Sequence, residues 1–182
     1  MQKTDDMLIS EIRDGHLEAF DALMQQHQAQ VYHVAYSYTK NEDQAMDITQ
    51  NVFLKVYENL HKFHGRSQFK TWMLRIAYNE SNNWIKKNKH NMTIENPDIF
   101  ASTENQESNF LVQENRIQML RCLYQLNTRY RLAVILRYFE NYSVREIAAV
   151  LKCSEGVVKN MLFRSMQQLR SSLQQEHMED VR

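Results

Sequence analysis

The chain contains too few turn-forming residues to fold as anything other than a set of helices. It has three Gly and a single Pro among 182 residues, whereas a many-stranded sandwich or barrel needs Gly or Pro at most of its turns. Leu, Gln, Glu, Arg, Met and Ala, which favour helices, recur along its whole length. We therefore expect an all-α fold.

Apolar residues recur at helical spacing in two separate stretches. The first is broken at Asp14-Gly15, at Lys40-Asn41 and at residues 64–67, which predicts a four-helix domain over residues 1–89. Residues 90–109 hold the only Pro and many Asn, Ser, Thr and Glu residues, a composition typical of a flexible linker. Helical spacing then resumes, so we expect a linker over 90–112, a smaller helical domain over 113–175 and a polar tail over 176–182.

Charge is distributed unevenly although the 22 basic and 22 acidic side chains cancel. Residues 55–90 carry 8 basic and 2 acidic side chains, and residues 113–175 carry 10 basic and 4 acidic ones. Residues 1–54, with 3 basic and 9 acidic side chains, and the linker are acidic. Such runs can be solvated helix faces, but two basic zones also suit a partner that is nucleic acid.

The stretch NYSVREIAAVLKCSEGVVKNMLFRSMQQLRSSL predicts a helix-turn-helix. Ser143 and Glu146 have the spacing of a capping box at the start of a short helix, and Ser154 can cap a longer second helix. No Gly stands between the helices, so Lys152 or Cys153 must make the turn. A packing hairpin without a DNA role is the alternative. On the polar side of the second helix we expect contacts with duplex DNA from Glu155, Lys159, Asn160 and Arg164.

Aromatic residues alternate with cations between residues 55 and 89. This composition suits unpaired DNA, because aromatic rings stack on exposed bases while cations follow the phosphates. Phe69 and Trp72 also fit a core stripe, and packing is the favoured interpretation for both. Trp84 and Phe63 are the rings for which a stacking role remains open.

Nothing in the sequence indicates catalytic chemistry. There is no Gly-rich phosphate loop, nucleophile elbow or paired-carboxylate arrangement, and neither the cysteines, Cys122 and Cys153, nor the seven His form a ligand set. We expect no catalytic residue, no metal, no cofactor and no small-molecule substrate. The N-terminus lacks the zones of a signal peptide, and no apolar run approaches the roughly 20 residues that span a bilayer, so we expect a cytoplasmic protein.

Three motifs give the chain a resemblance to a known family: DQAMDITQNVFLKVY from Asp43, FHGRSQFKTWMLRIAYN from Phe63, and LNTRYRLAVILRYFENYSVREIAAVL from Leu126. In this order and spacing, they resemble the bacterial RNA polymerase sigma factors of the extracytoplasmic-function group. The resemblance implies a promoter-specificity subunit that binds core RNA polymerase and promoter DNA. An anti-sigma factor, membrane-anchored in many relatives, is a further expected partner.

The resemblance also implies roles for individual residues. The core polymerase would bind the helix of the first motif at Asp47, Gln50 and Asn51. A loop and the helix after it would hold the melted minus-ten strand, with one base flipped into a pocket, through Lys62, Phe63, Arg66, Ser67, Lys70, Asn79, Asn83, Trp84, Lys86 and Lys87. The minus-35 duplex would be read by Ser154, Glu155, Gly156, Val157, Lys159, Asn160 and Arg164.

The sequence departs from the family pattern at several positions. Asn51 and Asn83 stand where acids are common, Asn127 replaces a Pro, and Val157 replaces a Thr. Two positions that are often Arg hold Met161 and Met166. Since fewer cations make fewer phosphate contacts, we expect the isolated C-terminal domain to bind its duplex element weakly at physiological salt.

Two other classes of protein remain open. A stand-alone helix-turn-helix regulator would bind a double-stranded operator without polymerase and show no preference for a melted strand. An enzyme acting on nucleic acid would need catalytic histidines, and only His61 and His64 have a spacing that places two on one helix face.

Overall fold

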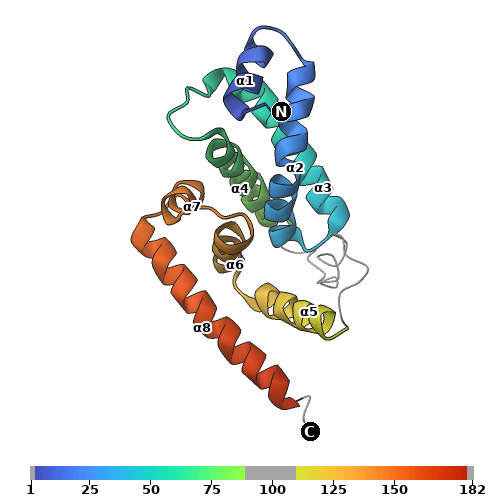
Figure 1. The fold of residues 1–182 in the computed structure, drawn as a ribbon, viewed down its shortest axis with the longest axis vertical. Helices are drawn as coiled ribbons and strands as arrows, with labels where there is room; N and C mark the ends of the chain where they lie inside the picture. The colour runs from blue at the N-terminus through green and yellow to red at the C-terminus, as the bar shows by residue number, and fades with distance from the viewer. Residues whose placement is uncertain (1–2, 89–109, 180–182) are drawn as a thin grey trace.

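The computed structural model describes residues 3–88 and 110–179, and within these ranges every regular element is a helix (Figure 1). The N-terminal elements are α1 (Asp5–Arg13), α2 (Glu18–Thr39), α3 (Glu42–Asn59), a short 3-10 helix (Leu60–Lys62) and α4 (Phe69–Asn88). The C-terminal elements are α5 (Phe110–Gln125), α6 (Thr128–Val134), a π-helical turn (Ile135–Phe139), α7 (Val144–Leu151) and α8 (Glu155–Glu179). The prediction of an all-α fold with two helical domains is confirmed.

Two expected boundaries differ from the structure. α5 begins at Phe110, so residues 110–112 of the expected linker are helical. Residues 90–109 of the expected linker lie outside the described residues. α8 continues to Glu179, so residues 176–179 of the expected tail are helical as well. A formed helix extends into polar sequence at little cost, because each added residue adds one backbone hydrogen bond.

The breaks between the N-terminal helices lie where the sequence predicts them. Gly15 and Gly65 both have a positive φ, 96° and 69°, a conformation that Gly adopts without strain. α2 ends at Lys40, which is left-handed, and the side chain of Asn41 then caps α3 by accepting from the amide of Gln44 at 3.0 Å.

α2, α3 and α4 pack around one apolar core, with α1 against α2. The side chains at its centre are buried: Leu23, Val31, Val34, Val52, Val56, Met73, Leu74 and Ala77. Leu17 has the helical spacing of these apolar residues but is 60% exposed, because it precedes the first turn of α2. Phe20 and Met24 are only partly buried and line a groove described below.

The helix-turn-helix forms through the local interactions that the sequence predicts. The Ser143 hydroxyl accepts from the amide of Glu146 at 3.2 Å, and the Glu146 carboxylate accepts from the amide of Ser143 at 2.8 Å. Lys152 is left-handed at the end of α7, so it takes the conformation that Gly often supplies. The Ser154 hydroxyl accepts from the amide of Val157 at 3.4 Å at the start of α8.

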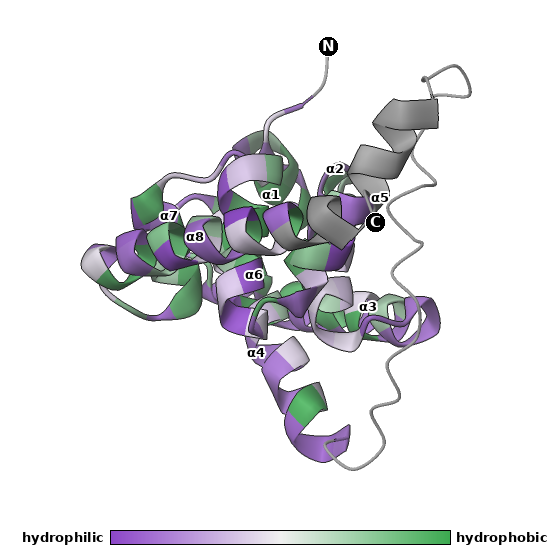
Figure 2. Ribbon diagram, turned by 90° about the horizontal axis from the view of Figure 1, so that it is seen from below, coloured by the Kyte–Doolittle hydropathy of each residue, from purple (hydrophilic) through white to green (hydrophobic). Residues whose placement is uncertain are grey.

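The two helical domains are packed together. α7 lies against α4, and α6 lies against α2 (Figure 1). The C-terminal end of α4 projects away from this contact and is mostly hydrophilic (Figure 2). None of the described helices is both long and apolar enough to cross a membrane.

Candidate nucleic-acid interface

The outer face of α8 and the residue before it hold the whole set predicted to read duplex DNA. All seven side chains or backbone positions are exposed: Ser154, Glu155, Gly156, Val157, Lys159, Asn160 and Arg164. Val158, Leu162 and Leu169 on the opposite face are buried against the rest of the domain. The start of α8 therefore presents amide groups, two cations and an amide side chain on one surface, as a recognition helix does.

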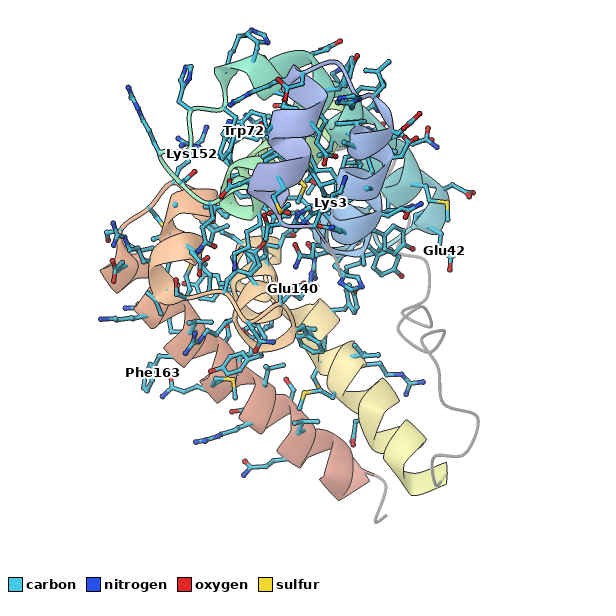
Figure 3. The ribbon with its side chains drawn as sticks, turned by 45° about the horizontal axis from the view of Figure 1, so that its top comes forward. Lys3, Glu42, Trp72, Glu140, Lys152 and Phe163 are labelled. Atoms are coloured by element: carbon cyan, nitrogen blue, oxygen red, sulfur yellow. The ribbon has the colours of Figure 1, made fainter. Side chains whose placement is uncertain are left out.

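The same face carries an aromatic ring that the sequence analysis did not include. Phe163 is 64% exposed and points away from the domain (Figure 3). An apolar side chain here can contact a thymine methyl group in the major groove. The available signal was an aromatic residue out of phase with the buried stripe of α8. In contrast, Met161 is 6% exposed, so at this position an apolar core contact replaces a cation.

The aromatic rings at the start of α4 form a packed cluster. The ring centroids of Phe63 and Phe69 lie 5.6 Å apart, and Trp72 lies 5.4 Å from Phe63 and 5.8 Å from Phe69. Phe69 is 2% exposed, and Trp72 packs partly buried against the core, as the favoured interpretation expected.

Phe63 is the buried member of the expected strand-binding set. Its side chain is 5% exposed, and the Arg13 guanidinium donates to its carbonyl oxygen. In this conformation the ring fills the core, so a stacking contact with a base would require the ring to leave it. The residues around it remain accessible, because Lys62, Arg66 and Ser67 are all exposed.

A second accessible group lies on the projecting end of α4. Asn83, Lys86 and Lys87 are exposed, and Asn79 and Trp84 are partly buried. Spacings of three to four residues place these polar side chains on one face of the helix: Asn79, Asn83, Lys86 and Lys87. That face combines amide groups and cations with a ring at its edge, which suits an unpaired strand.

Lys70, the remaining cation of the strand-binding set, is not free. Its Nζ lies 3.2 Å from Oε1 of Glu146 and 4.6 Å from the ring centroid of Tyr142, both in the C-terminal domain. Burial acts to raise the pKa of Glu146, but hydrogen bonds from Ser143 and Lys70 outweigh it and lower that pKa.

The residues predicted to bind polymerase lie at the edge of an apolar groove. Asp47, Gln50 and Asn51 are exposed on one face of α3. Gln50 also lines a groove of about 550 Å³ between α2 and α3. The other lining residues are mainly apolar, and the sequence analysis did not assign them to a site: Phe20, Met24, Gln28, Thr49, Phe53, Leu54 and Tyr57. Leu54 is 62% exposed, so this surface resembles a site for another protein.

Within the described residues, no cluster of three or more His, Cys, Asp or Glu side chains could hold a metal ion. Two of the histidines face single carboxylates instead. Nε2 of His27 lies 2.8 Å from Asp5, and Nδ1 of His33 lies 2.7 Å from Glu140.

Comparisons with known proteins match both halves of the chain. The family model described as sigma-70 region 2 matches residues 23–91, and the model described as sigma-70, region 4, matches residues 116–169. The RNA polymerase sigma-H factor of Pseudomonas aeruginosa is 29% identical, over 95% of each chain. The ECF RNA polymerase sigma-E factor of Escherichia coli is 28% identical, over 95% of this chain and 96% of that protein.

Solved structures share the fold. CnrH, in a structure with the cytosolic domain of CnrY, has a TM-score of 0.69 and 22% identity over 93% of this chain and 97% of that chain. The sigma factor RpoE of Bartonella quintana, in a structure with the anti-sigma factor NepR, has a TM-score of 0.70 and 22% identity over 85% and 96%.

Proposed function

We propose that the two domains of this chain read two different forms of promoter DNA. The chain belongs to the sigma-70 family and is an alternative sigma factor of the extracytoplasmic-function group, which directs transcription initiation. The N-terminal domain captures the melted minus-ten strand, and α8 reads the minus-35 duplex. The observation that carries this proposal is the presence of two separate exposed polar faces, one on each matched domain. Core RNA polymerase and promoter DNA are its partners.

The proposed minus-35 contacts use the exposed start of α8. Amide groups at the N-terminus of the helix favour a phosphate, while Lys159, Asn160 and Arg164 are placed to reach base edges or the backbone. Val157 and Phe163 give this face an apolar part that suits thymine methyl groups. Only two cations contribute, so the domain depends on polymerase to locate its element.

The proposed minus-ten contacts use α4 and the loop before it. Lys62 ends the 3-10 helix, Arg66 and Ser67 lie on the loop that follows it, and Lys86 and Lys87 lie a helix length away, so a strand can follow the surface between them. Trp84 is the ring of this set with an accessible side. Phe63 supports the loop from the core and does not contact the strand.

We assign the α2–α3 groove and its edge to core polymerase. Asp47, Gln50 and Asn51 supply polar contacts beside exposed Leu54 and Tyr57. This combination of an apolar centre and a polar rim is typical of protein–protein interfaces. The groove lies on a different helix pair from the duplex-reading face, so both can be occupied at once.

An anti-sigma factor is a further proposed partner. CnrH and RpoE, which share this fold, were both solved with a second protein, and NepR is named as an anti-sigma factor. We propose that this chain acts in the cytoplasm, performs no bond chemistry of its own and needs no metal, cofactor or small-molecule substrate.

The proposal is tested by run-off transcription with core polymerase over genomic fragments. We expect specific transcripts that require both proteins. A Gln50→Ala, Leu54→Ala double variant should lose core binding in a pull-down, whereas Glu18→Gln, on exposed α2 surface, should retain it. Duplex binding without any polymerase-dependent transcript would favour the stand-alone regulator instead.

A further inference from the structure

A tyrosine of the C-terminal domain is buried by the N-terminal domain. Tyr142 precedes α7 and is 0% exposed. Its hydroxyl donates to Oε1 of Gln30 on α2 at 3.3 Å, and Lys70 of α4 lies over its ring. Burial raises the pKa of Tyr142, and so do the nearby carboxylates of Glu140 and Glu146. The ring therefore fills a site formed by both α2 and α4.

Charged contacts surround this tyrosine. The described residues 118–174 contain three acidic side chains, and two of them, Glu140 and Glu146, pair with the N-terminal domain. Glu140, where the domains meet in Figure 3, contacts His33, and Glu146 contacts Lys70. The acidic side chains of this basic domain are thus concentrated on the face that it turns toward α2 and α4.

A buried arginine anchors the same contact from α6. Arg131 is 2% exposed, and its Nε donates to the carbonyl oxygen of Ser37 near the end of α2 at 3.0 Å. Its Nη1 donates to the carbonyl oxygen of Tyr124 at 2.9 Å. Lys40 donates to the same oxygen of Tyr124 at 3.2 Å, so two cations join the C-terminal ends of α2 and α5.

From these contacts we infer that the helix-turn-helix domain is an intramolecular inhibitor of strand capture. The inference rests on the proposed role of Lys70 in binding the minus-ten strand. While Glu146 and the ring of Tyr142 hold Lys70, its charge is neutralised by a carboxylate and one side of its ammonium group is covered, which weakens its attraction for a phosphate. Docking of α7 on α4 and binding of a strand at Lys70 therefore compete for the same cation, and release of α7 favours the strand.

The variant Glu146→Gln separates this contact from the stability of α7. Glu146 also belongs to the capping box, and Gln can serve at that position of a capping box. The substitution removes the charge that faces Lys70 but retains the cap. Glu42→Gln is the matched control, because it removes the same charge from an exposed residue on α3, far from α7 (Figure 3).

Two measurements on the full chain test the inference. Small-angle X-ray scattering reports the separation of the domains, and fluorescence anisotropy reports binding of a fluorescein-labelled, mixed-sequence single strand. We expect Glu146→Gln to increase the radius of gyration and to tighten strand binding by about two- to fivefold, as loss of one partly exposed ion pair predicts. Glu42→Gln should change neither, and Tyr142→Ala should increase the radius of gyration further.

The outcomes distinguish the inhibition from the function on which it rests. If Glu146→Gln matches Glu42→Gln in both measurements, the inhibition is refuted, while polymerase-dependent transcription can still support the proposed function. If the domains separate but strand binding does not tighten, both the inhibition and the role of Lys70 in strand capture are refuted. Circular dichroism checks that all three variants keep the wild-type helical content.

Discussion

The two regions proposed to bind DNA, on α8 and on α4, differ in how completely the isolated chain presents them. All seven residues expected on the α8 face are exposed. On α4 and its loop, Phe63 is in the core and Lys70 is held by the other domain. The duplex-reading face is thus formed and accessible from the start, whereas the strand-binding face is partly covered. We attribute this difference to the order of the steps, because a duplex exists before it is melted.

The largest effect should be the loss of stability when Phe63 is removed. Comparing it with removal of Trp84 distinguishes a ring that fills the core from a ring that binds DNA. Phe63→Ala should lower the free energy of unfolding by about 3–5 kcal/mol, because it leaves a cavity beside Phe69 and Trp72. Trp84→Ala should change stability much less, yet weaken binding of a single strand by about 1–3 kcal/mol. Thermal unfolding and strand binding of both variants provide the measurement. Equal stability of the two variants would contradict the placement of Phe63.

The next effect separates melting from duplex binding. Replacing Lys86 and Lys87 together by Ala should reduce open-complex formation by about a hundredfold, if each contributes one charge-assisted contact of about 1.5 kcal/mol. Permanganate reactivity of unpaired thymines measures open complexes, and a mobility-shift assay measures binding to the closed duplex. Duplex binding should change little. A parallel loss in both assays would remove the division between α4 and α8.

Removing the cations of α8 should have a smaller effect than removing those of α4. Replacing Lys159 and Arg164 together by Ala should weaken promoter binding by polymerase that carries this chain. The plot of log affinity against log salt concentration should also become less steep, by about 0.9 for each of the two lost phosphate contacts. Open-complex formation on a premelted template should be unaffected. Titration of binding against salt is the measurement, and an unchanged slope would show that neither side chain contacts a phosphate.

The smallest effect concerns the carboxylate at the domain contact. The pKa of Glu146 is lowered from its ordinary value of 4.5, so ionised Glu146 stabilises the folded protein above pH 4.5. That contribution is lost as the pH falls through the lowered folded pKa, since the side chain is then protonated in both states. The difference in unfolding free energy between wild type and Glu146→Gln should therefore shrink between pH 6 and pH 3, by about 1 kcal/mol or less. A constant difference across this range would contradict the hydrogen bonds from Ser143 and Lys70.

Most of the fold could be predicted from the sequence because local interactions determine it. The capping box at Ser143, the cap at Asn41 and the Gly residues at positions 15 and 65 each act within one turn of the chain. Asn127, a departure from the family pattern, is explained in the same way. Its side chain accepts from the amide of Arg129 at 3.1 Å and so caps the start of α6. A Pro would favour the same helix start through its fixed φ angle.

The site was less predictable where its residues meet partners that are distant in sequence. The polar face of α8 could be identified from helical periodicity alone. The burial of Phe63 depends on Phe69, Trp72 and Arg13, and the pairing of Lys70 depends on Glu146 in another domain. An aromatic ring in a basic segment has the same sequence signature whether it stacks on a base or fills a core. Only the tertiary contacts distinguish the two.

The docking of acidic side chains onto the N-terminal domain also affects how the protein searches the cell. Bulk chromosomal DNA attracts cations without regard to sequence and retains proteins that expose many of them. In this chain Lys70 is neutralised by an internal ion pair, and the net charge is zero, so its affinity for non-specific DNA is lower. We therefore expect it to diffuse freely between encounters and to reach polymerase before it reaches a promoter.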